Sequence, residues 1–219
     1  MKNLITISIL LLSIPVFGQK SYIGIKAGPS LTNVFADDYS VNNDPRIGYT
    51  GGLTYEHGFF EHFNLELDLL YAQRGFKNDI IFTDQYGEPT GEVYTTHFDY
   101  DYLTLPIKGS FTFGGKLNGF VSAGIVSSFL TKAKIRTPGF GIGGFSEDSD
   151  DTDHVNRFDF GGIAEIGGSV LIKEQFKLFM LFAYQQSFTS IKSDTYYYPS
   201  GARHFGMNIC LGFKYKIGR

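Results

Sequence analysis

The sequence contains no Trp, a single cysteine and no long apolar run. One cysteine cannot form a disulfide within the chain, and Cys210 alternates with bulky neighbours, so a small buried filler is a better interpretation than a reactive thiol. No window approaches the roughly 18 to 20 unbroken apolar residues that a membrane helix needs. Any membrane residence must therefore be through strands, and the mean hydropathy of -0.07 is compatible with that, because alternation hides the hydrophobicity of a barrel strand.

Motifs of common enzyme classes are missing as well. There is no G-x-S-x-G, no H-E-x-x-H and no cysteine pair. Gly139, Gly141 and Gly144 satisfy G-x-G-x-x-G, but no strand-turn-helix pattern surrounds them, so a flexible loop explains them better than a dinucleotide site. We therefore expect no enzyme activity and no cofactor.

An acidic run offers oxygen ligands to a hard cation. It lacks the Gly at the sixth position and the terminal Glu of a calcium loop, so a solvated loop is the expected state and cation binding is left open. The run consists of Glu147, Asp148, Asp150, Asp151 and Asp153.

The first 18 residues have the pattern of an export signal. Lys2 supplies a positive start, the stretch from Leu4 to Val16 is apolar but too short to span a bilayer, and Gly18 ends a small-residue cleavage site. We expect residues 1–18 to be a cleaved signal peptide and residues 19–219 to be one domain. The mature chain then carries 18 basic and 22 acidic residues, a net charge of about -4 that does not favour nucleic acid as a partner.

The stretch from Phe205 to Ile217 alternates with a period of two. Its large apolar residues are separated by Gly, Asn, Cys or Lys at every second position. A helix would scatter these residues around its circumference, whereas a strand places the bulky ones on one face and the small or polar ones on the other. A soluble barrel and a membrane barrel give the same pattern in one strand, so the remaining segments have to distinguish them.

Seven more alternating stretches precede the last one, and no helical period is found outside the signal segment. The sequence therefore predicts eight antiparallel strands. In residues 176–188 both sides are apolar at first, so which side faces inward is left open. The other six stretches are residues 22–28, 47–56, 63–76, 98–113, 120–131 and 158–172.

The connections between these strands alternate strictly between long and short. In an up-and-down barrel successive connections emerge at opposite ends, so one end is trimmed and the other elaborated, as in outer-membrane barrels. A soluble lipocalin-like barrel has no reason to sort its loops in this way. The long connections are residues 29–46, 77–97, 132–157 and 189–204, and the short ones are residues 57–62, 114–119 and 173–175.

Aromatic residues gather near the ends of the predicted strands. Two girdles at the membrane interfaces are typical of outer-membrane barrels, so we expect these rings to lie there. Near the short turns are Phe63, Phe111, Phe113, Phe120, Phe176, Phe213 and Tyr215, and near the long loops are Tyr71, Phe76, Phe98, Tyr100, Phe129, Phe158, Phe188 and Phe205.

The third and fourth strands carry two patterns, carboxylate-Leu-x-Tyr-x-x-x-Gly and Tyr-Leu-x-x-Pro. In these the chain resembles the PorT-type outer-membrane beta-barrel family of Bacteroidota, which are OmpA-like small barrels. The opening strand and the stretch from Tyr184 to Ile191 are also similar to the family, so the resemblance covers the whole mature chain. Two departures are an Asp where the family strand usually has Glu, and a tail that does not end on an aromatic. The matching residues are Asp68, Tyr71, Gly75, Tyr102, Leu103 and Pro106.

By the alternation, ten charged side chains point inward. The interior of an eight-stranded barrel is only just wide enough to be filled by side chains, so no free aqueous channel is expected. Glu66 and Asp68 fall in the same half as Lys108 and Lys214, and we interpret this set as a satisfied polar plug because buried charges must pair. A proton or ion path is the sharper alternative. The inward set is Lys26, Glu56, Glu66, Asp68, Arg74, Lys108, Asp159, Glu165, Lys214 and Lys216.

Pro106 cannot donate to a strand ladder, so we expect a bulge or local break there. The sequence as a whole predicts an all-β fold, an eight-stranded antiparallel up-and-down transmembrane barrel. We expect a monomer in the outer membrane of a two-membrane bacterium, surrounded by lipid, with both termini in the periplasm.

For function we expect a non-enzymatic scaffold whose long outward loops or periplasmic turns bind other proteins. The resemblance implies a second role, as an accessory part of a protein-secretion or gliding apparatus. A third alternative is a lipid-modifying enzyme, for which His204 with Ser187 or Ser200 on the lipid-facing rim is the candidate pair.

Overall fold

The computed structural model describes residues 20–35, 43–83, 86–139, 147–173, 175–191 and 201–217. These residues form nine antiparallel strands. The described part of the chain contains no helix that is long and apolar enough to cross a membrane. The expected signal peptide lies outside the described residues. The strands are β1 (Ser21–Phe35), β2 (Asn43–Gly58), β3 (Phe63–Thr83), β4 (Pro89–Gly114), β5 (Leu117–Thr137), β6 (Glu147–Asp150), β7 (Phe158–Ile172), β8 (Phe176–Ser187) and β9 (Arg203–Lys216).

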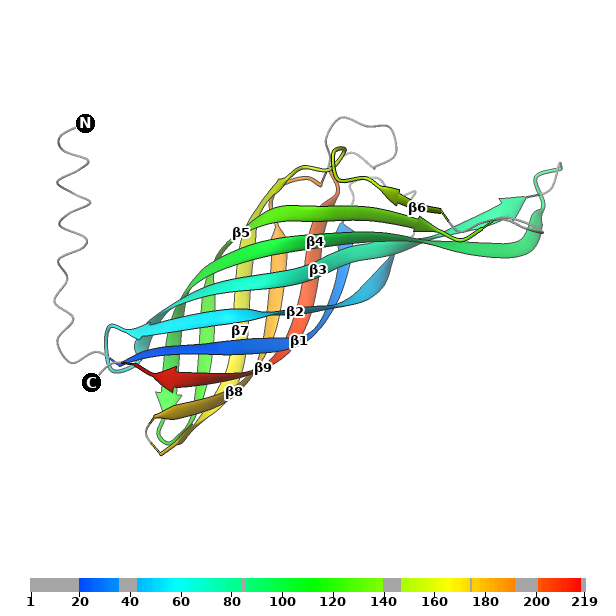
Figure 1. The fold of residues 1–219 in the computed structure, drawn as a ribbon. Helices are drawn as coiled ribbons and strands as arrows, with labels where there is room; N and C mark the ends of the chain where they lie inside the picture. Colours follow the sequence, from blue (N-terminus) through cyan, green and yellow to red (C-terminus); the bar gives the residue numbers. More distant parts are fainter. Residues whose placement is uncertain are drawn as a thin grey trace, which may run out of the picture.

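Eight of these strands close into a ring (Figure 1). Each strand pairs with the next along the chain, except that β5 is followed in the ring by β7, and β9 pairs back with β1 to close it. The short strand β6 pairs only with the last residues of β5 and lies outside the ring. The prediction of an eight-stranded up-and-down barrel is therefore confirmed, and each predicted stretch is one ring strand.

Bulky apolar side chains cover the outside of this ring. On β9, Ile209 and Leu211 are 53% and 62% exposed, whereas Cys210 between them is 2% exposed and Lys214, further along the strand, is 4% exposed. The strand β8 has the same alternation, with Met180 exposed. Its inward side is apolar too because those residues join an apolar cluster inside the barrel, which consists of Phe120, Val126, Ile163, Phe179, Leu181, Ala183 and Cys210.

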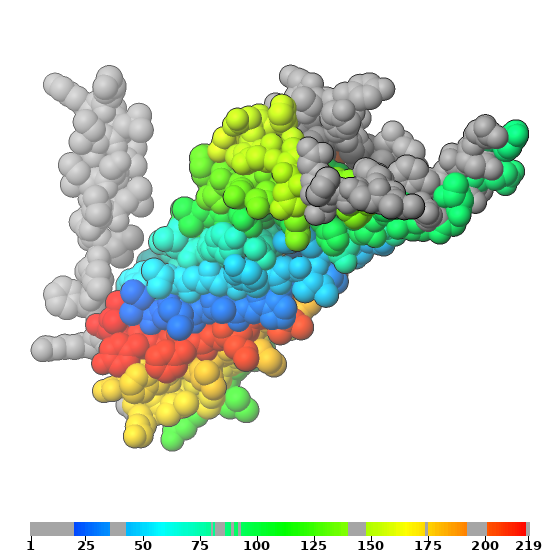
Figure 2. All heavy atoms as spheres, turned by 45° about the vertical axis from the view of Figure 1, so that its right-hand side comes forward, coloured from blue at the N-terminus to red at the C-terminus, as the bar shows by residue number. Residues whose placement is uncertain are grey.

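The strands at the long-loop end run further than the apolar alternation predicts. Residues 77–97 were expected to be a long loop, but β3 and β4 continue pairing from Lys77 opposite His97 to Ile81 opposite Val93. A backbone ladder needs no apolar face once it leaves the membrane, so apolar alternation cannot detect this extension. The resulting hairpin stands away from the body of the barrel (Figure 2).

Four of the expected girdle aromatics point into the barrel instead of toward lipid. Phe76, Tyr100 and Phe120 are 4%, 1% and 7% exposed, and Phe98 packs against Phe76 with ring centroids 4.4 Å apart. These rings fill part of the narrow lumen of the barrel. Other expected members, including Phe111, Phe129 and Phe213, do lie on the outer surface.

An apolar cap closes the lumen at the long-loop end. Three of its members come from connections rather than from ring strands: Val155 and Ile191, which are each 3% exposed, and Ala202, which is 1% exposed. Backbone bonds hold these segments together: the Asn156 amide donates to the Ile191 carbonyl at 3.0 Å, and the Ile191 amide donates to the Ala202 carbonyl at 2.8 Å. The cap consists of Val34, Phe76, Tyr100, Tyr102, Leu130, Ala133, Val155, Ile191 and Ala202.

Candidate functional site: a buried ion-pair network in the lumen

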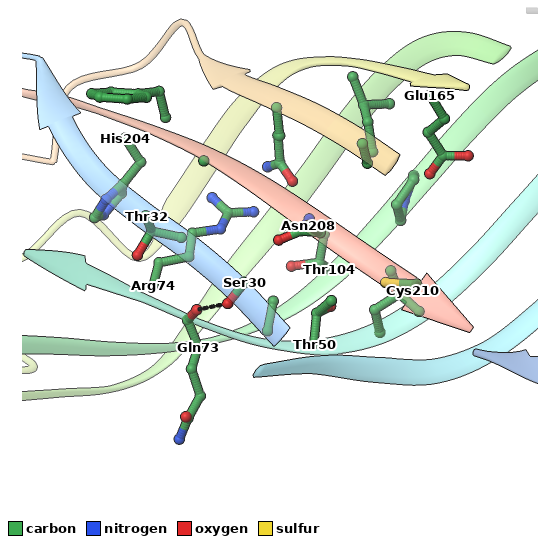
Figure 3. Close-up of a pocket in the computed structure, with 18 of the residues that line it drawn as sticks. Ser30, Thr32, Thr50, Gln73, Arg74, Thr104, Glu165, His204, Asn208 and Cys210 are labelled. Atoms are coloured by element: carbon green, nitrogen blue, oxygen red, sulfur yellow. Dashed lines mark hydrogen bonds between the residues drawn. The ribbon is translucent and has the colours of Figure 1, made fainter. Parts of the chain in front are cut away.

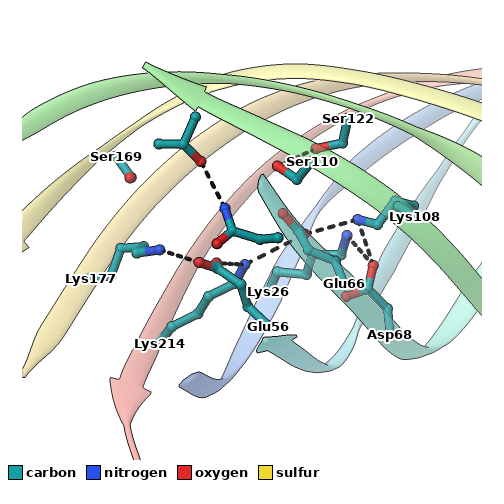
Figure 4. A network of polar contacts seen from close by, with 12 residues as sticks. Lys26, Glu56, Glu66, Asp68, Lys108, Ser110, Ser122, Ser169, Lys177 and Lys214 are labelled. Carbon is teal, nitrogen blue, oxygen red and sulfur yellow. Dashed lines mark hydrogen bonds and ion pairs between the residues drawn. The ribbon is translucent and has the colours of Figure 1, made fainter. Parts of the chain in front are cut away.

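The short-turn half of the lumen holds four lysines and four carboxylates in one network. Figure 4 labels all of them except Glu165. All but Lys177 are at most 5% exposed, and together they come from seven of the eight ring strands. Equal numbers of each sign make the network neutral when every group is charged. Its members are Lys26, Glu56, Glu66, Asp68, Lys108, Glu165, Lys177 and Lys214.

Lys108 is the centre of this network. Its Nζ lies 2.6 Å from Glu165 Oε2, 2.9 Å from Asp68 Oδ2 and 3.3 Å from Glu66 Oε2. Lys26 joins two of the same carboxylates, at 2.7 Å from Asp68 and 3.3 Å from Glu165. Each cation therefore bridges strands that are not neighbours in the sheet, across the barrel interior.

A second group of charges extends the network toward the short turns. Glu56 forms ion pairs with Lys177 and with Lys214, the latter at 2.8 Å. Lys214 also lies 3.5 Å from Glu66, which joins the two groups. Because a charge buried without a partner costs several kcal/mol, this continuous pairing is what allows so many ionised groups to occupy the lumen.

The structure thus brings together the four polar residues that the sequence singled out. Glu66, Asp68, Lys108 and Lys214 are all buried and all ion-paired within the network. Lys216, which was expected to face inward, is only half-buried. Sequence reasoning missed Lys177, because the apolar residues on both sides of β8 hide its inward register.

The motif residues of β3 and β4 lie on both faces of the sheet. Tyr102 is 1% exposed, with the Arg74 guanidinium 4.7 Å from the centre of its ring and its hydroxyl 3.4 Å from His204 Nε2. Tyr71 and Leu103 are cross-strand partners that face outward, and Leu103 is 46% exposed. The motif residues therefore lie on both faces of the β3–β4 pair, with Tyr102 toward the lumen and Tyr71 and Leu103 outward.

Gly75 sits where β3 approaches its neighbours most closely. Its φ is +151°, and a Cβ there would lie 1.9 Å from the Phe98 carbonyl oxygen. Its amide donates a hydrogen bond to Thr32 Oγ1 at 3.0 Å, which also holds the backbone in this position. Only glycine fits this position without moving the backbone.

Pro106 faces the lumen beside the network. The β3–β4 ladder pairs Leu67 with Ile107 and resumes at Leu70 with Thr104, without a change of register. Pro106 lies in that interval, as expected of a residue that has no N–H to donate. On the other side, the pairing of β4 with β5 continues through Pro106 opposite Val126.

A separate cluster of polar side chains lies between the network and the apolar cap. Asp159 accepts from Arg74 at 2.7 Å, from Ser187 at 2.8 Å and from Thr189 at 2.7 Å. Arg74 also donates to Ser128 at 2.8 Å. Both charges are thus satisfied by groups from four different parts of the chain.

The pair nominated for lipid chemistry does not lie at the lipid-facing rim. His204 is 2% exposed and Ser187 is 1% exposed, and both face the lumen because they share the inward register of their strands. Ser187 donates to Asp159, and within the described residues no hydrogen bond joins it to His204. Ser200 lies outside the described residues.

Another Ser–His contact, which the sequence did not suggest, lies near the short turns. Ser21 Oγ is 2.8 Å from His57 Nδ1, and the Tyr55 hydroxyl lies 3.5 Å and 3.4 Å from these two atoms. Ser21 and His57 are cross-strand partners in β1 and β2. Knowledge of this register would have been needed to find the pair, since the two residues are 36 positions apart.

The acidic run is engaged with protein groups of the same segment. His154 lies 3.1 Å from Asp151, and Arg157 lies 2.8 Å from Asp153. Asp150 Oδ1 accepts from the Thr152 hydroxyl and amide, which lowers the pKa of the Asp150 carboxyl. Within the part of the chain that the structure describes, no group of three or more His, Cys, Asp or Glu side chains could hold a metal ion.

Known outer-membrane proteins have a similar fold. The structure is similar to that of neisserial surface protein A, with a TM-score of 0.50 and 10% identity over 91% of this chain and 99% of that one. It also aligns with OprG of Pseudomonas aeruginosa (TM-score 0.48, 12% identity, 91% and 97% covered) and with outer membrane protein W of E. coli (0.41, 12%, 92% and 100%). At these identities the likeness concerns the fold alone. No match was found among curated proteins.

A family profile described as an outer membrane protein beta-barrel domain matches residues 17–193. This range contains every ring strand except β9, which closes the barrel against β1. The chain belongs to the outer membrane protein beta-barrel domain family.

Proposed function

We propose that this outer-membrane barrel is a closed, non-enzymatic scaffold whose long-loop side binds other macromolecules. The observation that carries the proposal is that side chains fill the lumen at both ends. The ion-pair network lies near the short turns and the apolar cap near the long loops. A barrel filled in this way offers no continuous path for a solute. Its working surface is then the part that extends beyond the barrel.

The extended β3–β4 hairpin is the most prominent part of that surface. Among the described residues, the pairing of β3 with β2 extends no further than Asn78, and that of β4 with β5 begins at His97. Tyr86, Ile81 and Val93 on this hairpin are 81%, 59% and 54% exposed. Exposed apolar and aromatic side chains on a paired ribbon are suited to contact with a protein partner.

The proposed orientation places the short turns and both termini in the periplasm and the long loops outside. Short periplasmic turns and longer outward loops are the rule among outer-membrane barrels. An export signal at residues 1–18 is part of the same proposal, because a barrel has to be secreted before it can insert.

Photo-crosslinking in whole cells tests this function. A photoreactive amino acid is placed at Tyr86, on the hairpin tip, and a matched one at Leu117, which is 77% exposed at the opposite end. The proposal expects adducts with macromolecules from position 86 and none from position 117. Absence of adducts from position 86 would contradict it.

The PorT-type assignment makes a different prediction in the same experiment. It rests on Asp68, Tyr71, Gly75, Tyr102, Leu103 and Pro106 in two patterns of β3 and β4. An accessory part of a secretion or gliding apparatus would meet its partners through the periplasmic turns. Adducts from position 117 with components of such an apparatus would therefore favour this role over the first.

A lipid-modifying enzyme is a second candidate, and the Ser21–His57 contact of 2.8 Å is the observation in its favour. A base hydrogen-bonded to a serine can activate it as a nucleophile. Among the described residues, however, no carboxylate is hydrogen-bonded to His57 to orient it. Labelling of the folded protein by a fluorophosphonate, lost in Ser21→Ala, would support the enzyme, and no labelling would exclude this serine.

A further inference from the structure

A polar chamber lies in the middle of the lumen, between the ion-pair network and the apolar cap (Figure 3). Its free volume is about 30 Å³. Lys26 and Glu165 of the network line it on one side and Arg74 and His204 on the other, with Thr104 and Asn208 between them.

Two side-chain atoms of this chamber are buried and have no hydrogen-bond partner among the residues that the structure describes. They are His204 Nδ1 and Thr104 Oγ1, on residues that are each 2% exposed. The other ring nitrogen of His204 is already engaged with Tyr102 at 3.4 Å. A buried polar atom without a partner is costly, so two of them at one cavity point to something that occupies it.

We propose that the chamber binds ordered water, which hydrogen-bonds to His204 Nδ1 and Thr104 Oγ1. A buried water needs a cavity of at least about 10 to 15 Å³ and two to four polar partners, and the chamber is large enough to meet this requirement. The proposal goes beyond the scaffold function and does not depend on what the long-loop side binds.

Water fits this chamber better than an ion or a larger solute. The charged groups that line it are already paired, Lys26 with Asp68 and Glu165, and Arg74 with Asp159. No unbalanced charge is left to hold an ion, and the volume excludes an organic molecule.

Thr54 offers a matched control elsewhere in the lumen. Like Thr104 it is buried, at 1% exposed, and its Oγ1 also has no hydrogen-bond partner. Unlike Thr104, Thr54 does not line this chamber or the smaller cavity beside Glu56 and Lys214. The two threonines therefore share burial and chemistry and differ in access to the chamber.

The substitutions Thr104→Val and Thr54→Val test the proposal by the sign of their effects. Removing an unpaired hydroxyl from a dry site relieves a penalty, whereas removing one that binds water loses a hydrogen bond. We expect Thr54→Val to raise the folding equilibrium constant about fivefold and Thr104→Val to lower it about fivefold. Because the chain has no Trp, urea unfolding in micelles is followed by gel mobility and far-UV circular dichroism.

Water-edited NMR of the unaltered protein in lipid nanodiscs detects the bound water directly, so this test does not require either variant to fold. The proposal expects transfer from water to Thr104 and His204 side chains and none to Thr54. Stabilisation by both substitutions, or no transfer to Thr104 and His204, would overturn it. A stability that depends on bromide or chloride in the unaltered chain but not in Thr104→Val would also overturn it, by identifying a bound halide.

Discussion

Removing the Lys108 ammonium is the sharpest perturbation of the lumen. In Lys108→Met the side chain keeps its bulk, but Glu165, Asp68 and Glu66 lose a cation that lies 2.6, 2.9 and 3.3 Å away. The network changes from four charges of each sign to three cations and four carboxylates. The remaining lysines cannot compensate for this without moving, because Lys26 and Lys214 are already ion-paired.

The size of the effect follows from these contacts. Each contact within 4 Å is worth about 4 kcal/mol at an effective dielectric constant of 20, and the burial of the lysine itself offsets much of the sum. Breaking a buried pair by removing one partner typically costs about 3 to 5 kcal/mol, and we expect Lys108→Met to lower the free energy of unfolding by that amount.

A second variant separates charge from packing. Adding Glu165→Gln to Lys108→Met restores three charges of each sign, and the double variant should recover more than half of the lost stability. Urea titrations of the refolded barrel, followed by gel mobility of unheated samples, measure both. A loss below about 1 kcal/mol, or a double variant less stable than the single one, would refute the reasoning.

Three further predictions concern other parts of the barrel. Gly28→Val should prevent closure at the β1–β9 seam, because a Cβ at Gly28 would lie 1.8 Å from the Ile209 carbonyl oxygen. Unheated samples of this variant should lose the compact gel band. Gly115→Ala is the control and should keep the band, because a Cβ at Gly115 would have no atom within 4 Å. Cys210, at 2% exposed, should react with a maleimide only after unfolding in urea, and rapid reaction of the folded protein would contradict its inward position. The Asp150 carboxyl should titrate by NMR below an ordinary aspartate and return toward the ordinary pKa in Thr152→Val; since its pKa is lowered, the Asp150–Thr152 contact is kept at neutral pH and lost as the pH falls through the lowered value.

Period-two alternation predicted the ring strands and the inward position of most buried charges. It does so because each strand separates lipid from lumen, so one sequence pattern encodes both faces. The same parity would have placed Phe98, Tyr100 and Phe76 correctly, since they share the register of Tyr102 and Arg74. Proximity to a strand end is a weaker guide than parity, because aromatic residues also fill the two ends of the lumen.

Partners within the network could not be predicted from the sequence. Lys26 meets Glu165 across 139 positions and Lys214 meets Glu56 across 158, and these contacts depend on strand tilt and register rather than on spacing. The long β3–β4 hairpin was missed for a different reason. Its strands carry only scattered apolar residues such as Ile81 and Val93, without the regular alternation that marks the ring strands.

The ion pairs between β9 and earlier strands also constrain the order of assembly. Lys214 is on β9, which follows the other ring strands in the chain, yet it forms ion pairs with Glu56 on β2 and Glu66 on β3. Until β9 docks between β1 and β8, these two carboxylates lack the Lys214 ammonium that the closed barrel supplies. Without Lys214 the network has three lysines and four carboxylates, since Glu56 keeps Lys177 and Glu66 keeps Lys108. Closure of the last seam therefore restores the charge balance of the interior, and this favours closed barrels over partly closed ones.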